Sequence, residues 1–374
     1  MLQSTSGSLK HQGCRRPNVK GTRGLLRSTQ LVLPDCKFKT PGRIVLPQDV
    51  SSGNIYSMEI PQSRPHACVA ILGGTGFIGR HLVEGWPESS TQSPHRLLIH
   101  RSRPAWLPKQ GFELREIDLT DPHNVVRALD QCDTLINLVR PDGDGTVLSA
   151  LKGLVRALAD SEIKRIVHAG SVEVYGSAEA PFVTESTPPQ PQTPYQLEHS
   201  ALETMWLSGS IPATLLRLGA VFGPSGRNLL SIASDMKHGR AVKLAAQRAL
   251  NGHRRLHLVA VTTVVDAVRR IVFAPTSDSH SILLVTADNA EQNNFSFVCD
   301  RFARAFGTHV PKGFIAPRAL LRVALKVRGQ SPAAATRRYS GAQLSALGIH
   351  PERTFAADID AYASHLAAQT PASP

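Results

Sequence analysis

The segment Gly73–Gly79 has glycines spaced for the binding of a negatively charged group. It reads GGTGFIG, which satisfies G-x-G-x-x-G from Gly74 and the related G-x-x-G-x-x-G from Gly73. Such glycines permit a tight turn, bring backbone N–H groups close to a pyrophosphate and let a helix pack closely on a strand, with the helix N-terminus facing the anion. The chemistry predicted here is dinucleotide binding. The residues expected to take part are Gly73, Gly74, Thr75, Gly76, Phe77, Ile78 and Gly79.

The residues on either side of this turn supply the context that the motif requires. Residues 67–72 are a continuous apolar run, as expected for a parallel strand buried on both faces. After the turn, Phe77, Ile78, Leu82 and Val83 recur at helical spacing. A strand before the glycines and a helix after them favour a dinucleotide site over the alternative, a glycine turn with a purely structural role.

The end of the second expected strand, residues 96–100, indicates which dinucleotide is preferred. An acidic residue there would accept hydrogen bonds from a ribose 2′-hydroxyl and favour NAD. The chain has Arg101 and Arg103 instead, and arginines form charge-assisted bonds to a 2′-phosphate. The sequence therefore favours NADP over NAD as cofactor, unless these two side chains simply face water.

A third expected strand, residues 112–117, leads into Asp118 and Leu119, which are further candidates for the cofactor site. Asp118 is expected to contact the adenine edge. Thr120 or Asp121 can cap the helix that follows, because an oxygen of either side chain can accept a hydrogen bond from a backbone N–H. The cap and the adenine contact are compatible, since different residues serve them.

The elements that must position these groups are short β-branched runs alternating with helical patterns from Pro65 onward. This alternation is typical of βαβ units and a mostly parallel sheet. Leu138 and Val139, at the end of a fourth strand expected over 134–139, are candidates for the cofactor site. A long helix is expected over 147–160, and a fifth strand over 165–169 runs into Ser171.

The predicted fold class is α/β, a Rossmann-type doubly wound parallel sheet with a smaller C-terminal α/β substrate lobe. The expected divisions are a basic N-terminal extension over 1–64, a dinucleotide-binding domain over 65–225 with elements returning at about 256–272, and a lobe made mainly of 226–374.

The order of the motifs resembles a known superfamily. The glycine turn, the strand end HAGSVEVYG, Tyr195 with a basic residue four positions later and the strand-loop LLRLGAVFGPSG are similar to extended short-chain dehydrogenases/reductases, specifically the NAD-dependent epimerase/dehydratase branch. The resemblance covers roughly residues 66–368 and includes the closing stretch LSALGIHPERTFAADIDAYASHL.

This resemblance implies a catalytic set of Ser171, Tyr195 and His199. Ser171 is expected to hydrogen-bond the substrate oxygen and Tyr195 to exchange a proton with it, while a hydride passes to or from the nicotinamide. Hydride addition to carbon leaves charge on oxygen that a positioned acid must neutralise.

The family has a lysine one helical turn after the tyrosine, where this chain has His199. The i, i+4 spacing places His199 on the same helix face as Tyr195, where it can bond a ribose hydroxyl. A neutral imidazole does not favour an ionised phenol as an ammonium does. Two outcomes follow: slow or narrowly pH-dependent catalysis, or loss of catalysis with the nucleotide still bound.

Two departures bear on the substrate. Sugar-nucleotide members of the family usually have Asn where this chain has Ala220, and an acidic pair where it has Thr262 and Thr263. Both weaken the case for a UDP-sugar. Arginines and lysines of the lobe retain phosphate-binding potential, although each is equally expected as a solvated surface charge. The substrate-site candidates are Ser171, Val172, Glu173 and Arg227.

The resulting hypothesis is an NAD(P)-dependent oxidoreductase or epimerase that transfers a hydride at a hydroxyl or carbonyl carbon of a small or sugar-nucleotide substrate. The alternative is a catalytically weak or inactive NADP(H)-holding scaffold or sensor. It resembles the accessory subunit of respiratory complex I, whose fourth strand ends in a stretch similar to Ile136–Arg140. The resemblance also suggests a homodimer through the helices near 145–160 and 194–208.

The net charge of +13 is unevenly distributed. Before Met58 the chain has nine Lys or Arg and two Asp, whereas the rest carries 33 basic and 27 acidic residues. That part has only a mild basic excess and no long Lys/Arg run, so we expect no nucleic-acid partner. A basic amphipathic pattern over 311–329 is expected to be a solvated outer face, not a membrane contact.

Residues 1–64 are basic, acid-poor and without apolar periodicity, which predicts a disordered extension. An organellar transit peptide and a start at Met58 are the alternatives. No apolar run approaches the 18 residues of a membrane span, and we expect a cytoplasmic protein. The five cysteines show no C-x-x-C pair and no metal-ligand spacing, which favours a reducing compartment and no metal site.

Overall fold

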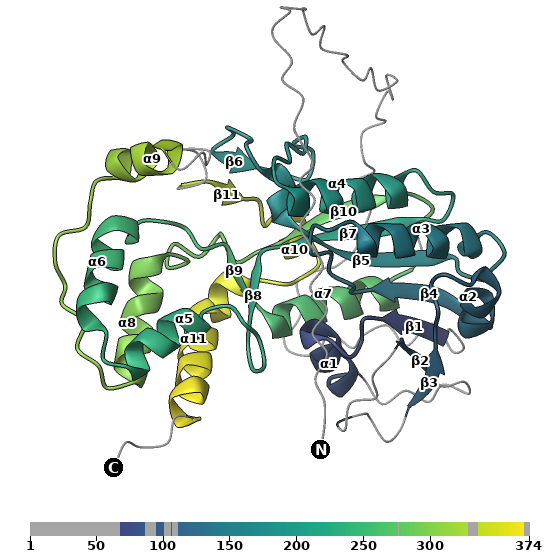
Figure 1. Ribbon diagram of the computed structural model, residues 1–374, viewed down its shortest axis with the longest axis horizontal. Helices are drawn as coiled ribbons and strands as arrows, with labels where there is room; N and C mark the ends of the chain where they lie inside the picture. The colour runs from purple at the N-terminus through teal and green to yellow at the C-terminus, as the bar shows by residue number, and fades with distance from the viewer. Residues whose placement is uncertain are drawn as a thin grey trace, which may run out of the picture. The chain divides into compact units, whose positions relative to one another are not determined.

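The apolar run before the glycine turn forms strand β1, Cys68–Leu72, inside a seven-stranded parallel sheet (Figure 1). The strand order is β10-β7-β5-β4-β1-β2-β3. All residues of β1 are buried, as predicted for a strand covered on both faces. The other strands of this sheet are β2 (His95–Ile99), β3 (Phe112–Glu116), β4 (Cys132–Asn137), β5 (Arg165–Ser171), β7 (Ala213–Leu218) and β10 (Ser281–Val285).

The computed structural model describes residues 68–86, 95–100, 106, 111–275, 277–327 and 336–369. These residues all fall in the unit Thr40–Pro374. The predictions for the extension over 1–64 and for Arg101 and Arg103 lie outside the described residues.

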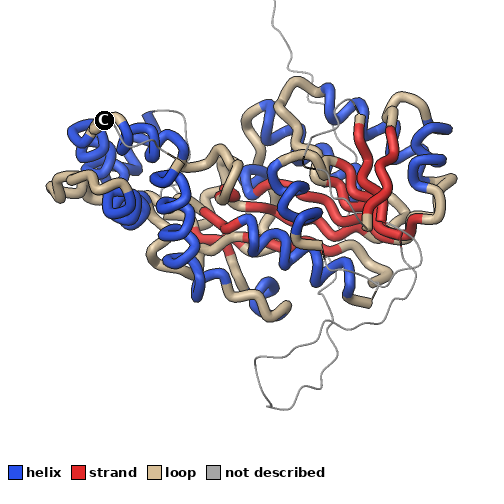
Figure 2. The backbone as a smooth tube through the Cα atoms, turned by 90° about the horizontal axis from the view of Figure 1, so that it is seen from below, coloured by secondary structure: helices blue, strands red, loops and turns tan. Residues whose placement is uncertain are grey.

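Alternate residues of β1 point into two different apolar layers. Val69 and Ile71 pack with α1 (Phe77–Glu84) and α7 (Val261–Phe273) on one face of the sheet. Ala70 and Leu72 pack with helices on the other face. Figure 2 shows helices on both sides of the strands, which confirms the doubly wound α/β class. The helices of the second face are α2 (Pro122–Leu129), α3 (Thr146–Leu158) and α4 (Pro194–Leu207).

A further apolar cluster lies between four helices in the second half of the chain. Its buried aromatic residues are Phe222, Phe302, Phe355 and Tyr362. These helices lie at the left of Figure 1. The domain limits drawn from the sequence stay a prediction. The helices of this cluster are α5 (Leu230–Lys237), α6 (Ala241–Asn251), α8 (Phe295–Ala305) and α11 (Pro351–Ala368).

Two short strand pairs lie outside the seven-stranded sheet, and one of their strands, β9 (Leu258–Ala260), falls where elements were expected to return at about 256–272. Strand β8 (Ala220–Phe222) pairs with β9, and β6 (Phe182–Val183) pairs with β11 (Arg338–Tyr339). The remaining elements are a 3₁₀ turn, η1 (Val172–Tyr175), and helices α9 (Arg318–Val327) and α10 (Ala342–Ala346). No helix in the described ranges combines the length and the apolar content needed to span a bilayer.

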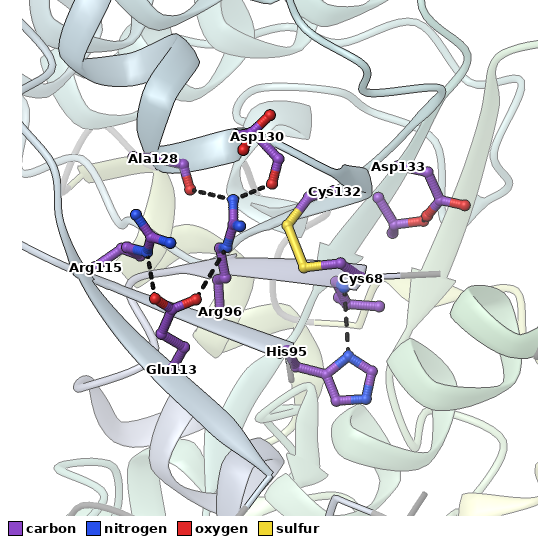
Figure 3. The surroundings of a disulfide bond; sticks show 11 residues. Cys68, His95, Arg96, Glu113, Arg115, Ala128, Asp130, Cys132 and Asp133 are labelled. Atoms are coloured by element: carbon purple, nitrogen blue, oxygen red, sulfur yellow. Dashed lines mark hydrogen bonds and ion pairs between the residues drawn. A yellow bond between two sulfur atoms is a disulfide. The ribbon is translucent and has the colours of Figure 1, made fainter. Parts of the chain in front are cut away.

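A disulfide joins Cys68 and Cys132 at the amino edge of the sheet (Figure 3). These residues begin the neighbouring strands β1 and β4 and lie directly opposite each other, with Cα atoms 4.3 Å apart. The sequence spacing did not predict this pair, because 64 residues separate the two cysteines. Nearby, the Arg96 guanidinium donates to the carbonyls of Ala128 and Asp130, so the amino edge is held by both covalent and polar contacts.

Candidate active site

The glycine turn has the tight packing that its sequence predicted. Gly73 adopts a φ of 81°, which favours glycine, and its carbonyl accepts a hydrogen bond of 3.0 Å from the N–H of Gly76. A Cβ on Gly74 would overlap the side chain of Leu97, and a Cβ on Gly79 would overlap the backbone of Gly74. The turn therefore cannot accept larger residues at these positions without moving the strand or the helix.

Helix α1 begins directly after the turn and presents its N-terminus there. Its N-cap is Gly76, so no side chain caps the first turn. The strand end that carries Leu138 and Val139 lies against the same turn, since a Cβ on Gly73 would stand 2.9 Å from the carbonyl carbon of Leu138. A glycine turn that leads directly into an uncapped helix N-terminus suits a pyrophosphate, so the residues present fit a dinucleotide.

Asp118 and Leu119 follow the carboxyl end of β3. Asp118 is exposed and accepts hydrogen bonds from the hydroxyl and the N–H of Thr120, which hold the pKa of its carboxyl below the usual range. Leu119 packs against the apolar layer beneath α2 and α3. Of the two cap candidates, Asp121 caps α2 by accepting from the N–H of His123 at 2.9 Å. Asp118 is thus left available on the surface.

Ser171 is the last residue of β5, and its hydroxyl caps the 3₁₀ turn η1 by accepting from the N–H of Glu173. Val172 is buried, whereas Glu173 is exposed and accepts a hydrogen bond of 3.1 Å from the amide of Gln196 on α4. The turn that carries Ser171 is thereby fastened to the start of the helix that carries Tyr195.

Helix α4 begins with a capping box that fixes its first turn. Thr193 accepts from the N–H of Gln196, and Gln196 accepts from the N–H of Thr193. Tyr195 is the second residue of the helix and is half-buried. Its hydroxyl accepts a hydrogen bond of 3.2 Å from Nε of Arg140, and the guanidinium carbon lies 5.1 Å from the centroid of its ring.

Arg140 was not among the site residues that the sequence predicted. It follows Leu138 and Val139 on the loop between β4 and α3, and its side chain is exposed. The sequence contained one signal, the stretch Ile136–Arg140, but nothing in its local spacing connects residue 140 with residue 195. Only the packing of α4 against this loop brings the guanidinium to the phenol.

His199 lies one helical turn after Tyr195 and is only 2% exposed. Its ring stands edge-on to the ring of Tyr195, with centroids 4.6 Å apart, so the two residues share a helix face. Within the described residues neither ring nitrogen has a hydrogen-bond partner. Burial, and to a smaller degree the charge of Arg140, lowers the pKa of His199 to about 4, so the imidazole is neutral at pH 7.

A second buried histidine, His168 on β5, lies beyond His199. Its Nδ1 is 3.2 Å from the amide nitrogen of Asn137 on β4, while its Nε2 has no partner among the residues described. Burial, with a further contribution from His199, lowers the pKa of His168 to about 3. Two neutral imidazoles, one on α4 and one on β5, are therefore buried between this helix and the sheet.

Glu198 fastens α4 to the loop that carries Arg140. The residue is only 5% exposed, and its carboxylate accepts hydrogen bonds from the N–H groups of Gly143 and Gly145 before α3 and of Leu148 in its first turn. Gly143 has a φ of 95°, and a Cβ there would lie 3.0 Å from the backbone nitrogen of Tyr195. The loop and the helix are therefore held in close contact beside the phenol.

Other polar features lie away from these contacts. Arg227 is exposed on the loop between β8 and α5, and no contact joins it to Ser171 or Tyr195 in the described part of the chain. A hollow of about 320 Å³ has mostly polar and basic walls. Its lining residues are His253, Arg255, Glu291, Thr336 and Arg338.

The chain matches a known family over most of its sheet. Residues 69–285 match the model of the NAD dependent epimerase/dehydratase family. The chain is 31% identical over 254 residues to a dTDP-6-deoxy-L-talose 4-dehydrogenase (NAD(P)(+)) from Kitasatospora kifunensis, which covers 62% of this chain and 74% of that protein.

Two solved structures share the fold. One is the Bordetella bronchiseptica enzyme WbmG in complex with NAD and UDP, with a TM-score of 0.60, 18% identity, and coverage of 83% of this chain and 96% of that one. The other is RMD from Pseudomonas aeruginosa complexed with NADPH, with a TM-score of 0.56, 18% identity, and coverage of 81% and 99%. By the match over most of the sheet and the similarity to a named dehydrogenase, this chain belongs to the NAD dependent epimerase/dehydratase family.

Proposed function

We propose that this chain is a nicotinamide-dinucleotide-dependent oxidoreductase or epimerase in which Tyr195 is the acid-base group. One observation carries the proposal. The strand end Leu138–Val139 touches the glycine turn, and the next residue, Arg140, hydrogen-bonds the Tyr195 hydroxyl. The segment Leu138–Arg140, directly after β4, thereby connects the phenol with the glycine turn.

The dinucleotide would be held by Gly73–Gly79, with its pyrophosphate at the N-terminus of α1. Leu138 and Val139, Asp118 and Leu119 are the further contacts proposed, together with Tyr195 and His199. When bound, the nicotinamide supplies or accepts the hydride. The similarity to a dehydrogenase named for NAD(P)+ and to a structure with NADPH supports use of either dinucleotide. Arg101 and Arg103 favour NADP.

In the reductive direction the Tyr195 O–H bond breaks and its proton goes to the substrate oxygen. The carbonyl carbon gains the hydride at the same time, so that the C=O group becomes a CH–OH group. In the oxidative direction the ionised phenol takes the hydroxyl proton back. Ser171, at the end of β5, is proposed to hydrogen-bond the same oxygen and to lower the energy of the charge that develops there.

A nucleotide-sugar substrate is favoured by the names of the relatives, which include a dTDP-deoxysugar dehydrogenase and an enzyme crystallised with UDP. Val172, Glu173 and Arg227 remain proposed substrate contacts. A homodimer through α3 and α4 also remains a proposal.

The test combines binding and turnover. The purified chain is incubated with NAD+ or NADP+ and a panel of nucleotide sugars, and reduced nicotinamide is followed by its absorbance, while native mass spectrometry measures bound dinucleotide. We expect Tyr195→Phe to lower kcat by about 10²- to 10⁴-fold with dinucleotide affinity unchanged, and Ser171→Ala to have a smaller effect. Gly79→Leu should abolish binding, because its side chain would fill the turn.

Two results would overturn the proposal. If the wild-type chain binds no dinucleotide, the glycine turn does not have the proposed role. If it binds the dinucleotide but turns over no substrate with either cofactor, the alternative of a nucleotide-holding scaffold is the better account. The second result would agree with the absence of a lysine at position 199.

A further inference from the structure

We propose that Arg140 is a positioning residue of this site, which holds the Tyr195 hydroxyl and supplies the positive charge that His199 does not. This inference rests on the proposed function of Tyr195. It concerns a residue on a different element, the loop between β4 and α3, and it explains how the site can work with a histidine one turn after its tyrosine.

The geometry places the guanidinium on the reacting oxygen itself. Nε of Arg140 donates to the Tyr195 hydroxyl at 3.2 Å, and the guanidinium carbon stands 5.1 Å from the ring centroid, within cation–π range. The charged or titratable side chains in contact with Tyr195, among the described residues, are Arg140 and His199. The first is a cation and the second a neutral ring.

The different burial of His199 and Arg140 explains why the first is neutral and the second is charged. His199 is enclosed, its ring nitrogens lack partners in the described ranges, and burial lowers its pKa to about 4. Arg140 is exposed at the rim, and a guanidinium is not deprotonated in proteins. The cation next to the phenol is therefore an arginine that reaches in from the neighbouring loop.

The direction of the hydrogen bond suits acid-base chemistry. Because Arg140 donates and the phenol oxygen accepts, the hydroxyl proton of Tyr195 stays available for the substrate oxygen. Once that proton has left, the same Nε–H faces a negatively charged oxygen, and a hydrogen bond between two charged groups is stronger than one to a neutral phenol. The contact is thus available to the phenol oxygen both before and after the proton leaves.

The loop is held in the conformation that this contact needs. Glu198, which lies between Tyr195 and His199 on α4, accepts three N–H groups from the segment Gly143–Leu148. Gly143 also packs directly on the backbone of Tyr195. Arg140 therefore approaches from a loop whose position relative to α4 is fixed by a buried carboxylate.

The first experiment compares Arg140→Gln with Arg140→Lys and with a control, Arg156→Gln. The control removes an exposed arginine on α3, away from the loop that carries Arg140. We expect Arg140→Gln to lower kcat by on the order of 10- to 100-fold with little change in KM, and to displace its pH profile to higher pH. Arg140→Lys should recover part of the rate and keep the profile near that of the wild type. The control should behave as the wild type.

A second readout does not depend on turnover. Labelling with 3-fluorotyrosine gives a ¹⁹F resonance for Tyr195, identified by its loss in Tyr195→Phe. In the protein without substrate, we expect Arg140→Gln to shift this resonance, whereas Arg156→Gln leaves it in place. If the Tyr195 resonance does not shift in Arg140→Gln, the contact is refuted, whatever the activity of that variant.

A third experiment uses His199→Lys. In the wild-type background we expect no large gain in kcat, because Arg140 already supplies the charge, whereas in the Arg140→Gln background the same change should restore activity. If His199→Lys alone raises kcat by two orders of magnitude, Arg140 does not replace the lysine.

The outcomes separate this inference from the proposed function. If Tyr195→Phe is inactive while Arg140→Gln has wild-type kcat and pH profile, the inference fails and the role of Tyr195 stands. If Tyr195→Phe is fully active, the proposed function fails first, and the fluorine measurement still decides whether the two side chains touch. Should His199→Lys not fold, the Arg140 variants and the fluorine spectra decide alone.

Discussion

Helix α4 contacts two buried polar clusters that differ in how well their groups are paired. In one, Arg217 on β7 donates to both oxygens of Glu203 at 2.8 to 3.1 Å and to the hydroxyl of Tyr175, which in turn donates to the carbonyl of Thr184. In the other, within the described residues, His199 has no hydrogen bond and His168 uses one ring nitrogen.

The two clusters differ in whether their buried polar side chains have hydrogen-bond partners. Buried polar groups in proteins are nearly always hydrogen-bonded, because an unpaired one costs free energy. The Glu203 cluster obeys this rule and anchors the distal part of α4 to the sheet. The histidine cluster departs from it directly beside Tyr195, where both ring nitrogens of His199 are buried without a partner among the described residues.

The largest effect is expected from breaking the buried ion pair between Arg217 and Glu203. Arg217→Met leaves the Glu203 carboxylate buried without its cation, and we expect the free energy of unfolding to fall by about 3 to 5 kcal/mol. Denaturant titration of the purified variant measures it. The double variant Arg217→Met, Glu203→Leu should recover most of this loss, since no buried charge is then left unpaired. A single variant as stable as the wild type would show that the ion pair does not anchor α4.

The next effect is the pH dependence of stability. Burial lowers the pKa of His199 to about 4 and of His168 to about 3, below the value of 6.5 for an unfolded chain. As the pH falls below 6.5, the unfolded chain binds protons that the folded chain does not, so the free energy of unfolding decreases down to about pH 4. For each histidine the loss is on the order of 3 kcal/mol.

His199→Phe should flatten this dependence without abolishing it. His168 and His95, whose pKa burial also lowers to about 4, still contribute in the same direction. Thermal melts of the wild type and the variant between pH 7 and pH 4.5 give the comparison. Parallel curves for the two proteins would mean that His199 is not excluded from protonation in the folded state.

A smaller effect is expected from loosening the loop between β4 and α3, which lies beside Tyr195. Glu198→Gln replaces a carboxylate that accepts three N–H groups by an amide with a single acceptor oxygen. We expect a loss of about 2 kcal/mol and faster hydrogen exchange at the amides of Gly143, Gly145 and Leu148. Glu179→Gln, which changes an exposed glutamate, serves as the control. Unchanged exchange at all three amides would contradict the anchoring role.

The smallest effect concerns the start of α4. Thr193→Ala removes the side chain of the capping box and should destabilise the protein by about 1 kcal/mol. Thr193→Ser keeps the hydroxyl and should restore stability. Chemical denaturation of the three proteins measures this difference, and equal midpoints would show that Gln196 alone suffices to hold the helix start.

The sequence predicted most of the sheet, because buried parallel strands give continuous apolar runs. It was less accurate where tertiary contacts end a strand. The fourth strand was expected over 134–139 but forms at Cys132–Asn137. The Leu138 N–H still bonds to the carbonyl of Leu72 on β1, but the Val139 N–H bonds to the side chain of Asn137 instead of a neighbouring strand, so the pairing ends there.

The candidate site was predictable where it depends on local spacing. The glycine turn and the shared face of Tyr195 and His199 follow from motifs a few residues long. The contact of Arg140 with Tyr195 joins residues 55 positions apart, and the unpaired state of His199 depends on how α4 packs against β5. Neither can be derived from residue types and spacing in a single sequence.

The bonds from Glu198 to the first turn of α3 also affect how the site moves. Because one carboxylate on α4 holds three neighbouring amides, the start of α3 and the loop before it should follow any shift of α4. Arg140 belongs to that loop and Tyr195 to that helix, so such a shift should leave the spacing of phenol and guanidinium nearly constant. A motion of α4 during ligand exchange would then keep Arg140 on the Tyr195 hydroxyl.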